Sequence, residues 1–164
     1  MDRLARTLHG DELKVAFAFL LTMPGAPFIY YGDEIGLRYV ENLVSVEGGY
    51  SRTGSRSPMQ WNHGVNLGFS NASPEKLYIP TDDKPNSPTV EDQMKDPNSL
   101  YYEVKKLIAL RREHSALLSD GNIEFVSDGA DGSPLAYIRS SADEKILVVV
   151  NPADREAVLN VPGD

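Results

Sequence analysis

The chain has 164 residues, of which 41% are hydrophobic, so a packed core in one domain or two small ones is expected rather than global disorder. Its formal net charge of -8 argues against nucleic-acid and anionic-membrane partners, because both require a positive field. The sequence contains no cysteine, which excludes disulfides and thiolate metal sites, and no apolar run approaches the roughly 20 residues that a membrane helix needs.

The first predicted element is a buried helix that Asp11 caps and that Met23, Pro24 and Gly25 end. Its apolar residues recur at helical spacing and form one broad face. Residues 26–31 follow at once and are apolar at successive positions, which favours a strand covered on both faces. A buried helix followed by such a strand is typical of a parallel α/β sheet.

Residues 38–97 are rich in Gly, Pro, Asn, Ser and Asp and show no regular period. Apolar side chains such as Trp61 and Phe69 nevertheless interrupt this stretch, so an ordered, elaborated loop is predicted rather than a solvated linker. A second helix is predicted after a cap at Asn98 or Ser99. Its basic last turn, which begins at Arg111, suits the negative end of that helix.

After residue 118 the pattern changes to short strands separated by turn signals. The predicted strands are 123–127, 134–139, 145–151 and 156–161. Closely spaced strands of this kind predict an antiparallel sheet or sandwich, with a domain boundary near residue 119. A lone parallel strand cannot form a sheet, so the first 118 residues are interpreted as the end of a larger α/β domain.

Four segments of the sequence resemble a known family. They are MPGAPFIYYGDEIGL, RTGSRSPMQWN, GFSNASPEKLYIP and DPNSLYYEVKKLIALRREHSAL, in this order. Together they resemble the α-amylase superfamily of glycoside hydrolases. The resemblance is strongest to the branch of oligo-1,6-glucosidases, α-glucosidases, dextran glucosidases and trehalose synthases, whose motif R-S/T-P-M-Q-W is similar to the second segment.

This resemblance implies a (β/α)₈ TIM barrel followed by an antiparallel β-sandwich. Residues 26–31 would be the eighth barrel strand, and the two predicted helices would be the seventh and eighth barrel helices. Residues 1–118 would then form the C-terminal segment of the barrel, and residues 119–164 the start of a partial sandwich domain. We expect an opened barrel edge of this kind to self-associate or to rearrange.

The family uses an Asp nucleophile, a Glu acid/base and a third Asp, and none of the three has a counterpart in this chain. We therefore expect the C-terminal portion of a retaining enzyme that acts on short α-glucosides, inactive by itself, from the cytoplasm of a bacterium. One alternative is a trehalose synthase-like isomerase or transglycosylase, which differs in how well its pocket excludes water. Another is a non-catalytic sugar-binding or assembly module.

The acids Asp33 and Glu34 lie near the end of the first of these segments. A retaining glycosidase needs two carboxyl groups about 5–5.5 Å apart, whereas adjacent residues at a strand end point to opposite faces. A structural role is therefore favoured for the two acids, in which one of them pairs with a neighbouring arginine or with loop amides. No catalytic residue is predicted within this chain.

Arg56 is the predicted substrate-binding residue. The resemblance implies that the arginine of R-S/T-P-M-Q-W reaches the terminal glucose of an oligosaccharide. A guanidinium suits this role because it carries five donors in a fixed geometry. Arg52 lacks such support and is predicted to be structural or solvated, and the only tryptophan, Trp61, is predicted to anchor the loop.

No metal ion or cofactor is expected. His63 and His114 have no Cys or His partner at ligand spacing, which makes a zinc site improbable. The pair Asp82-Asp83 is too short a cluster to indicate calcium. No segment has the Lys-Ser/Thr ending of a phosphate loop.

Overall fold

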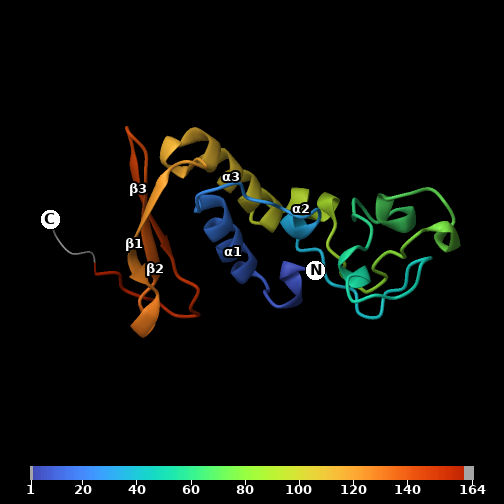
Figure 1. Ribbon diagram of the computed structural model, residues 1–164. Helices are drawn as coiled ribbons and strands as arrows, with labels where there is room; N and C mark the ends of the chain where they lie inside the picture. The colour runs from blue at the N-terminus through green and yellow to red at the C-terminus, as the bar shows by residue number, and fades with distance from the viewer. Residues whose placement is uncertain (1, 161–164) are drawn as a thin grey trace. The chain divides into compact units, whose positions relative to one another are not determined.

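The computed structural model describes residues 2–160 (Figure 1). Its helices are α1 (Asp11–Thr22), α2 (Val90–Lys95) and α3 (Leu100–Glu113), and its strands are β1 (Asn122–Asp128), β2 (Leu135–Ser140) and β3 (Lys145–Val150). Short 3₁₀ turns fill much of the remainder. None of the helices within residues 2–160 has the length and apolarity that crossing a membrane requires.

The described residues separate into two compact units. The first unit takes in residues 2–13 and 29–103, and the second takes in residues 14–28 and 104–160. Helices α1 and α3 each contribute to both. This division does not test the predicted domain boundary near residue 119, which stays a prediction.

The sheet lies in the second unit and has the order β1-β2-β3, with antiparallel neighbours (Figure 1). Tyr137 of the central strand is fully buried and pairs in register with Phe125 and Val148. Its hydroxyl lies 2.5 Å from Thr22 Oγ1, and the ring of Phe19 meets its ring edge-on. The last two turns of α1 therefore pack on the sheet through one tyrosine, which couples helix and strands.

Arg111 on α3 is buried and forms hydrogen bonds with the end of another helix, α1. Its Nη1 donates to the carbonyl oxygens of Leu21 and Met23, both at 2.8 Å, and its Nη2 donates to that of Gly25 at 2.6 Å. Arg111 lies in the last turn of α3, as predicted, but its guanidinium donates to carbonyls at the end of α1. Burial lowers the pKa of Arg111.

Arg139 on β2 is fully buried and also forms hydrogen bonds near the end of α1. It donates to the carbonyl oxygens of Thr22, of Leu118 at 2.7 Å, of Gly121 at 3.2 Å and of Asn122 at 3.1 Å. Burial, followed by the nearby charge of Arg111, lowers the pKa of Arg139. The guanidinium therefore holds the end of α1 to the segment that leads into β1.

The two long helices form where the sequence predicts them, with different details at their starts. Helix α1 begins at Asp11 itself, so Asp11 lies within the first turn, and the carboxylate of Glu12 accepts a 2.7 Å hydrogen bond from the amide of His9. Ser99 rather than Asn98 caps α3, because its Oγ accepts from the amide of Tyr102 at 3.5 Å.

Three of the five predicted strands are confirmed, with ends that differ by at most one residue. The strand predicted at 26–31 is wrong: residues 26–30 have no regular secondary structure, because no described segment pairs with them. Residues 156–160 form no strand either, and Val161 lies outside the described residues. There the side chain of Asn151 turns the chain by binding the amide of Ala153 and the carbonyl of Arg155.

The long stretch 38–97 is ordered, as predicted, through side-chain hydrogen bonds in the first unit. The Arg38 guanidinium donates from Nε to Asp82 at 2.9 Å and from Nη2 to Ser87 at 2.8 Å, and the Asp82 side chain is almost fully buried. Helix α2 lies within this stretch and was not predicted. Thr89 caps it by accepting from the amide of Asp92 at 3.1 Å, so the spacing Thr-x-x-Asp was an available signal.

Glu144 joins the turn between β2 and β3 to the segment after α3. His114 Nδ1 lies 2.6 Å from its Oε1, and the amide of Ala116 donates to its Oε2 at 3.1 Å. These two hydrogen bonds, that of His114 first, lower the pKa of Glu144 below its usual value of 4.5. The carboxylate form is therefore favoured in the folded chain.

Replacing Arg139 with Leu should lower the free energy of unfolding by roughly 2–4 kcal/mol, because several buried carbonyl oxygens lose their donor at once. Urea denaturation followed by far-UV circular dichroism measures this. Arg112→Leu is the control, since Arg112 is exposed on α3, and it should change the stability by less than about 0.5 kcal/mol. Equal effects of the two changes would contradict the assigned role of Arg139.

Glu144→Gln should remove a pH-dependent part of the stability. Because the folded state lowers the pKa of Glu144, its contribution is present above 4.5 and is lost as the pH falls through the folded pKa. Wild type should therefore exceed the variant in stability at about pH 6, and the difference should close towards about pH 3. Glu124→Gln, on an exposed residue of β1, should show no such convergence. A difference that persists at low pH would contradict the account.

Candidate functional site

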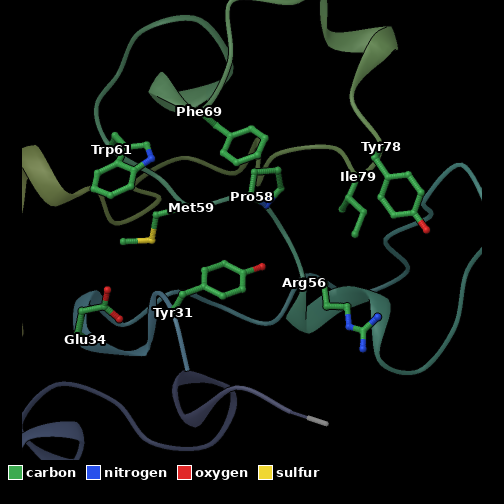
Figure 2. Close-up of a pocket in the computed structure, with 9 residues that line it drawn as sticks. All are labelled: Tyr31, Glu34, Arg56, Pro58, Met59, Trp61, Phe69, Tyr78 and Ile79. Carbon is green, nitrogen blue, oxygen red and sulfur yellow. The ribbon is translucent and has the colours of Figure 1, made fainter. Parts of the chain in front are cut away.

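A pocket of about 380 Å³ lies within the first unit (Figure 2). Its lining is largely aromatic and apolar, with one acid and one arginine, and comprises Tyr31, Glu34, Arg56, Pro58, Met59, Trp61, Phe69, Tyr78 and Ile79. A volume of this size suits a small organic ligand or one unit of a larger one. The pocket contains Arg56, the residue that the sequence analysis singles out for binding.

The turn after Tyr31 shapes one side of the pocket. Gly32 adopts a left-handed φ of 85°, and a Cβ on it would lie 2.8 Å from the buried side chain of Leu37, so glycine is required there. The hydroxyl of Tyr31 donates to the carbonyl of Ser57 at 3.0 Å, which ties this turn to the loop that carries Arg56. Burial, above all, raises the pKa of Tyr31 to about 12, so the phenol remains a donor.

Asp33 is used structurally. The buried Arg3 donates from Nη1 to Asp33 Oδ1 at 3.1 Å and to the carbonyl of Tyr31, and its guanidinium lies over the ring of Tyr30. The prediction that one of the two acids pairs with an arginine is confirmed. Burial raises the pKa of Asp33 by more than the hydrogen bond and charge of Arg3 lower it, so the pair positions the turn more than it stabilises it.

Glu34 is used differently from its neighbour. Its side chain lines the pocket, and its Oε2 is buried without a hydrogen-bond partner among the described residues. The two adjacent acids therefore do not act on a common point, in agreement with the sequence analysis. Their separate roles could not be predicted, because the sequence does not show which acid Arg3 holds.

Arg56 reaches the pocket from a turn that its neighbours fix. It directly follows a 3₁₀ turn, η3 (Thr53–Ser55), whose residues are buried. A Cβ on Gly54 would collide with the carbonyl oxygen of Val40, and the amide of Arg56 donates to the carbonyl of Thr53 at 2.9 Å. The Arg56 side chain is exposed and lines the pocket, whereas a binding role for it stays a prediction.

The ring of Trp61 is not buried, although Trp61 was predicted to anchor the loop. Its backbone is anchored, because its amide donates to the carbonyl of Leu67 at 2.8 Å and its carbonyl accepts from Glu91 at the start of α2. Its ring, however, is 49% exposed and lines the pocket together with the half-exposed rings of Phe69 and Tyr78 (Figure 2). The aromatic wall thus comes from the loop whose apolar residues first indicated order.

The remaining candidates lie outside this pocket. The guanidinium of Arg52 stacks on the ring of Tyr50, and His63 Nε2 lies 2.6 Å from Asp92 Oδ2 at an exposed position. Hydrogen bonds from Thr89 and then His63 lower the pKa of Asp92. Within residues 2–160, no group of three or more His, Cys, Asp or Glu side chains has the arrangement of a metal site.

Comparison with known proteins adds independent information. Residues 2–121 match the family model described as "Alpha amylase, catalytic domain". The chain is similar to a trehalose synthase from Pimelobacter sp. (strain R48), at 36% identity over 159 residues, which covers 91% of this chain and 26% of the relative. It is also similar to a glucan 1,6-alpha-glucosidase from Streptococcus pneumoniae serotype 4, at 34% identity over 183 residues, which covers 94% of this chain and 33% of the relative.

Among solved structures, the chain is similar to a mutant trehalose-6-phosphate hydrolase from Bacillus licheniformis in complex with PNG. The TM-score is 0.79 at 27% identity, and the match covers 100% of this chain and 35% of that one. The chain thus spans about a quarter to a third of the length of these relatives. Because the family model matches most of its residues, the chain belongs to the alpha-amylase family.

Proposed function

We propose that this chain supplies the C-terminal part of an alpha-amylase-family enzyme that acts on short α-glucosides, and that its pocket contacts a sugar unit. The observation that carries the proposal is the position of Arg56. The arginine of the segment RSPMQW lines a pocket of about 380 Å³ with an aromatic wall. The trehalose synthase and glucan 1,6-alpha-glucosidase among its relatives support the same substrate class.

The chemistry of the pocket suits a sugar. Aromatic rings such as Trp61 and Phe69 offer flat apolar surfaces against which the C–H face of a pyranose packs. Arg56 offers donors to the hydroxyl oxygens of a sugar. A pocket that combines apolar walls with a few polar groups binds a neutral polar ligand and fixes its orientation.

The reacting carboxylates are proposed to come from polypeptide outside this sequence. A retaining mechanism needs two carboxyl groups about 5–5.5 Å apart on either side of the bond that breaks. Of the acids in the described residues, Glu34 alone is among those lining this pocket, while Arg3 holds Asp33. In the same proposal the chain completes a (β/α)₈ barrel and begins a β-sandwich, and residues 26–31 become a strand once a neighbouring strand pairs with them.

A trehalose synthase-like isomerase is the second candidate, and the Pimelobacter relative favours it. A hydrolase admits water to the glycosyl intermediate, whereas an isomerase retains the released sugar and excludes water. Product analysis of the full-length enzyme on maltose separates the two activities. Glucose as the main product indicates a hydrolase, and trehalose indicates the isomerase.

Trp61 provides a direct test of sugar binding, because it is the only tryptophan and lines the pocket. Titration of the 164-residue chain with maltose should change its fluorescence with a dissociation constant in the millimolar range. Arg56→Ala should weaken binding by about tenfold or more, because the ligand loses charge-assisted hydrogen bonds. Arg52→Ala removes the same charge outside the pocket and should leave binding unchanged.

The accompanying activity assay uses p-nitrophenyl α-glucoside. The 164-residue chain should not hydrolyse it, and turnover would contradict the proposal that the reacting carboxylates lie elsewhere. Binding of maltose that is equally strong in Arg56→Ala would contradict the proposed site. A non-catalytic binding module would bind maltose with the same dependence on Arg56, but the full-length protein would then convert no α-glucoside.

Two further expectations stay predictions. Self-association through an opened barrel edge should appear in light scattering as a species larger than a monomer, and a clean monomer would contradict it. We also propose a bacterial source, which the bacterial relatives support, and a cytoplasmic location.

A further inference from the structure

We propose that Glu34 binds the sugar as well, by accepting hydrogen bonds from its hydroxyl groups at the end of the pocket away from Arg56. The inference rests on the proposed function and deepens it, because it identifies the acceptor of the site. Glu34 would thus be a ligand-binding residue, whereas Asp33 beside it is structural.

The hydrogen-bonding state of Glu34 is the first observation. Its Oε2 is buried and has no hydrogen-bond partner among the described residues, as is also true of Nε and Nη2 of Arg3, Oγ of Ser57 and Oε1 of Gln60. Among these residues, Glu34 is the one that lines the pocket. A buried carboxylate oxygen without a donor is costly, and native structures retain such a group chiefly where a ligand, an ion or an ordered water completes it. Glu34 lines the pocket, so a molecule in that pocket lies next to its side chain.

The contrast with Asp33 is the second observation. Both acids belong to the same short turn, η2 (Asp33–Ile35), and experience the same backbone. Arg3 is fully buried and satisfies Asp33, so the turn already has its structural ion pair. The Oε2 of Glu34 has no partner among the described residues, so Glu34 does not duplicate the role of Asp33.

The polarity of the pocket defines the ligand. Figure 2 shows Glu34 and Arg56 at separate ends of the site, with Tyr31 between them. A carboxylate only accepts hydrogen bonds and a guanidinium only donates them. A ligand that satisfies both must donate at one end and accept at the other, and hydroxyl groups do both. A polyhydroxylated ligand with an apolar face meets these demands, whereas an apolar ligand leaves both groups unpaired.

The test compares maltose binding, by Trp61 fluorescence, in the 164-residue chain and three variants. Glu34→Gln keeps the shape and removes the charge, and Glu34→Leu removes the acceptor as well. Glu124→Gln makes the same charge change at an exposed position on β1 and serves as the control. The dissociation constant should rise about fivefold in Glu34→Gln and more than tenfold in Glu34→Leu, and stay within twofold in the control.

Thermal unfolding of the same variants distinguishes a structural role of Glu34 from a ligand-binding role. Neither Glu34 variant should melt below wild type, because an unpaired buried carboxylate does not stabilise the fold. A fall in melting temperature of more than a few degrees, or failure to fold, in both variants would show that Glu34 is structural and would overturn the inference.

The binding outcomes separate the inference from the proposed function. If Arg56→Ala weakens maltose binding while both Glu34 variants bind like wild type, Glu34 does not contact the sugar and the proposed function stands. If wild type does not bind maltose at all, the proposed sugar site is wrong and the inference falls with it. Weakened binding in both Glu34 variants at unchanged stability supports the assignment.

Discussion

The buried contact between Arg3 and Asp33 determines how two adjacent acids are used. Arg3 lies against Tyr30 and Tyr31 and binds the backbone and side chain of the turn that follows them. Because successive side chains leave a turn in different directions, fixing Asp33 leaves Glu34 free to face the pocket. The turn that carries Tyr31 and Glu34 into the pocket is therefore held in place by Arg3, which does not itself line the pocket.

The opposite wall depends on a long loop that has order without much regular structure. Arg38 and the buried Asp82 tie two distant parts of it together, and the amides at the start of α2 bind the backbone carbonyls of Gln60 and Trp61. Such interactions hold half-exposed aromatic rings in place, which a flexible loop could not do. Long ordered loops on a scaffold commonly carry function, and this one supplies most of the pocket.

Local patterns in the sequence predicted α1, α3 and the strands of the sheet, because each has its own period and caps. The prediction of a strand at 26–31 was wrong, because a strand needs a neighbouring strand to pair with. An apolar run in the sequence does not show whether such a neighbour is present. The hydrogen-bond partners of Arg111 were not predicted, because they are the carbonyls of Leu21, Met23 and Gly25, far away in sequence. Arg56 was found from its motif, whereas the difference between Asp33 and Glu34 required knowing where Arg3 lies.

The most direct test of the sugar pocket is a two-dimensional amide NMR titration of the ¹⁵N-labelled chain with maltose. The account predicts shift changes concentrated at the pocket, in the amides of Tyr31, Glu34, Arg56, Trp61 and Tyr78, with the strands β1–β3 unaffected. Changes that concentrate on the sheet, or no changes at saturating maltose, would contradict it.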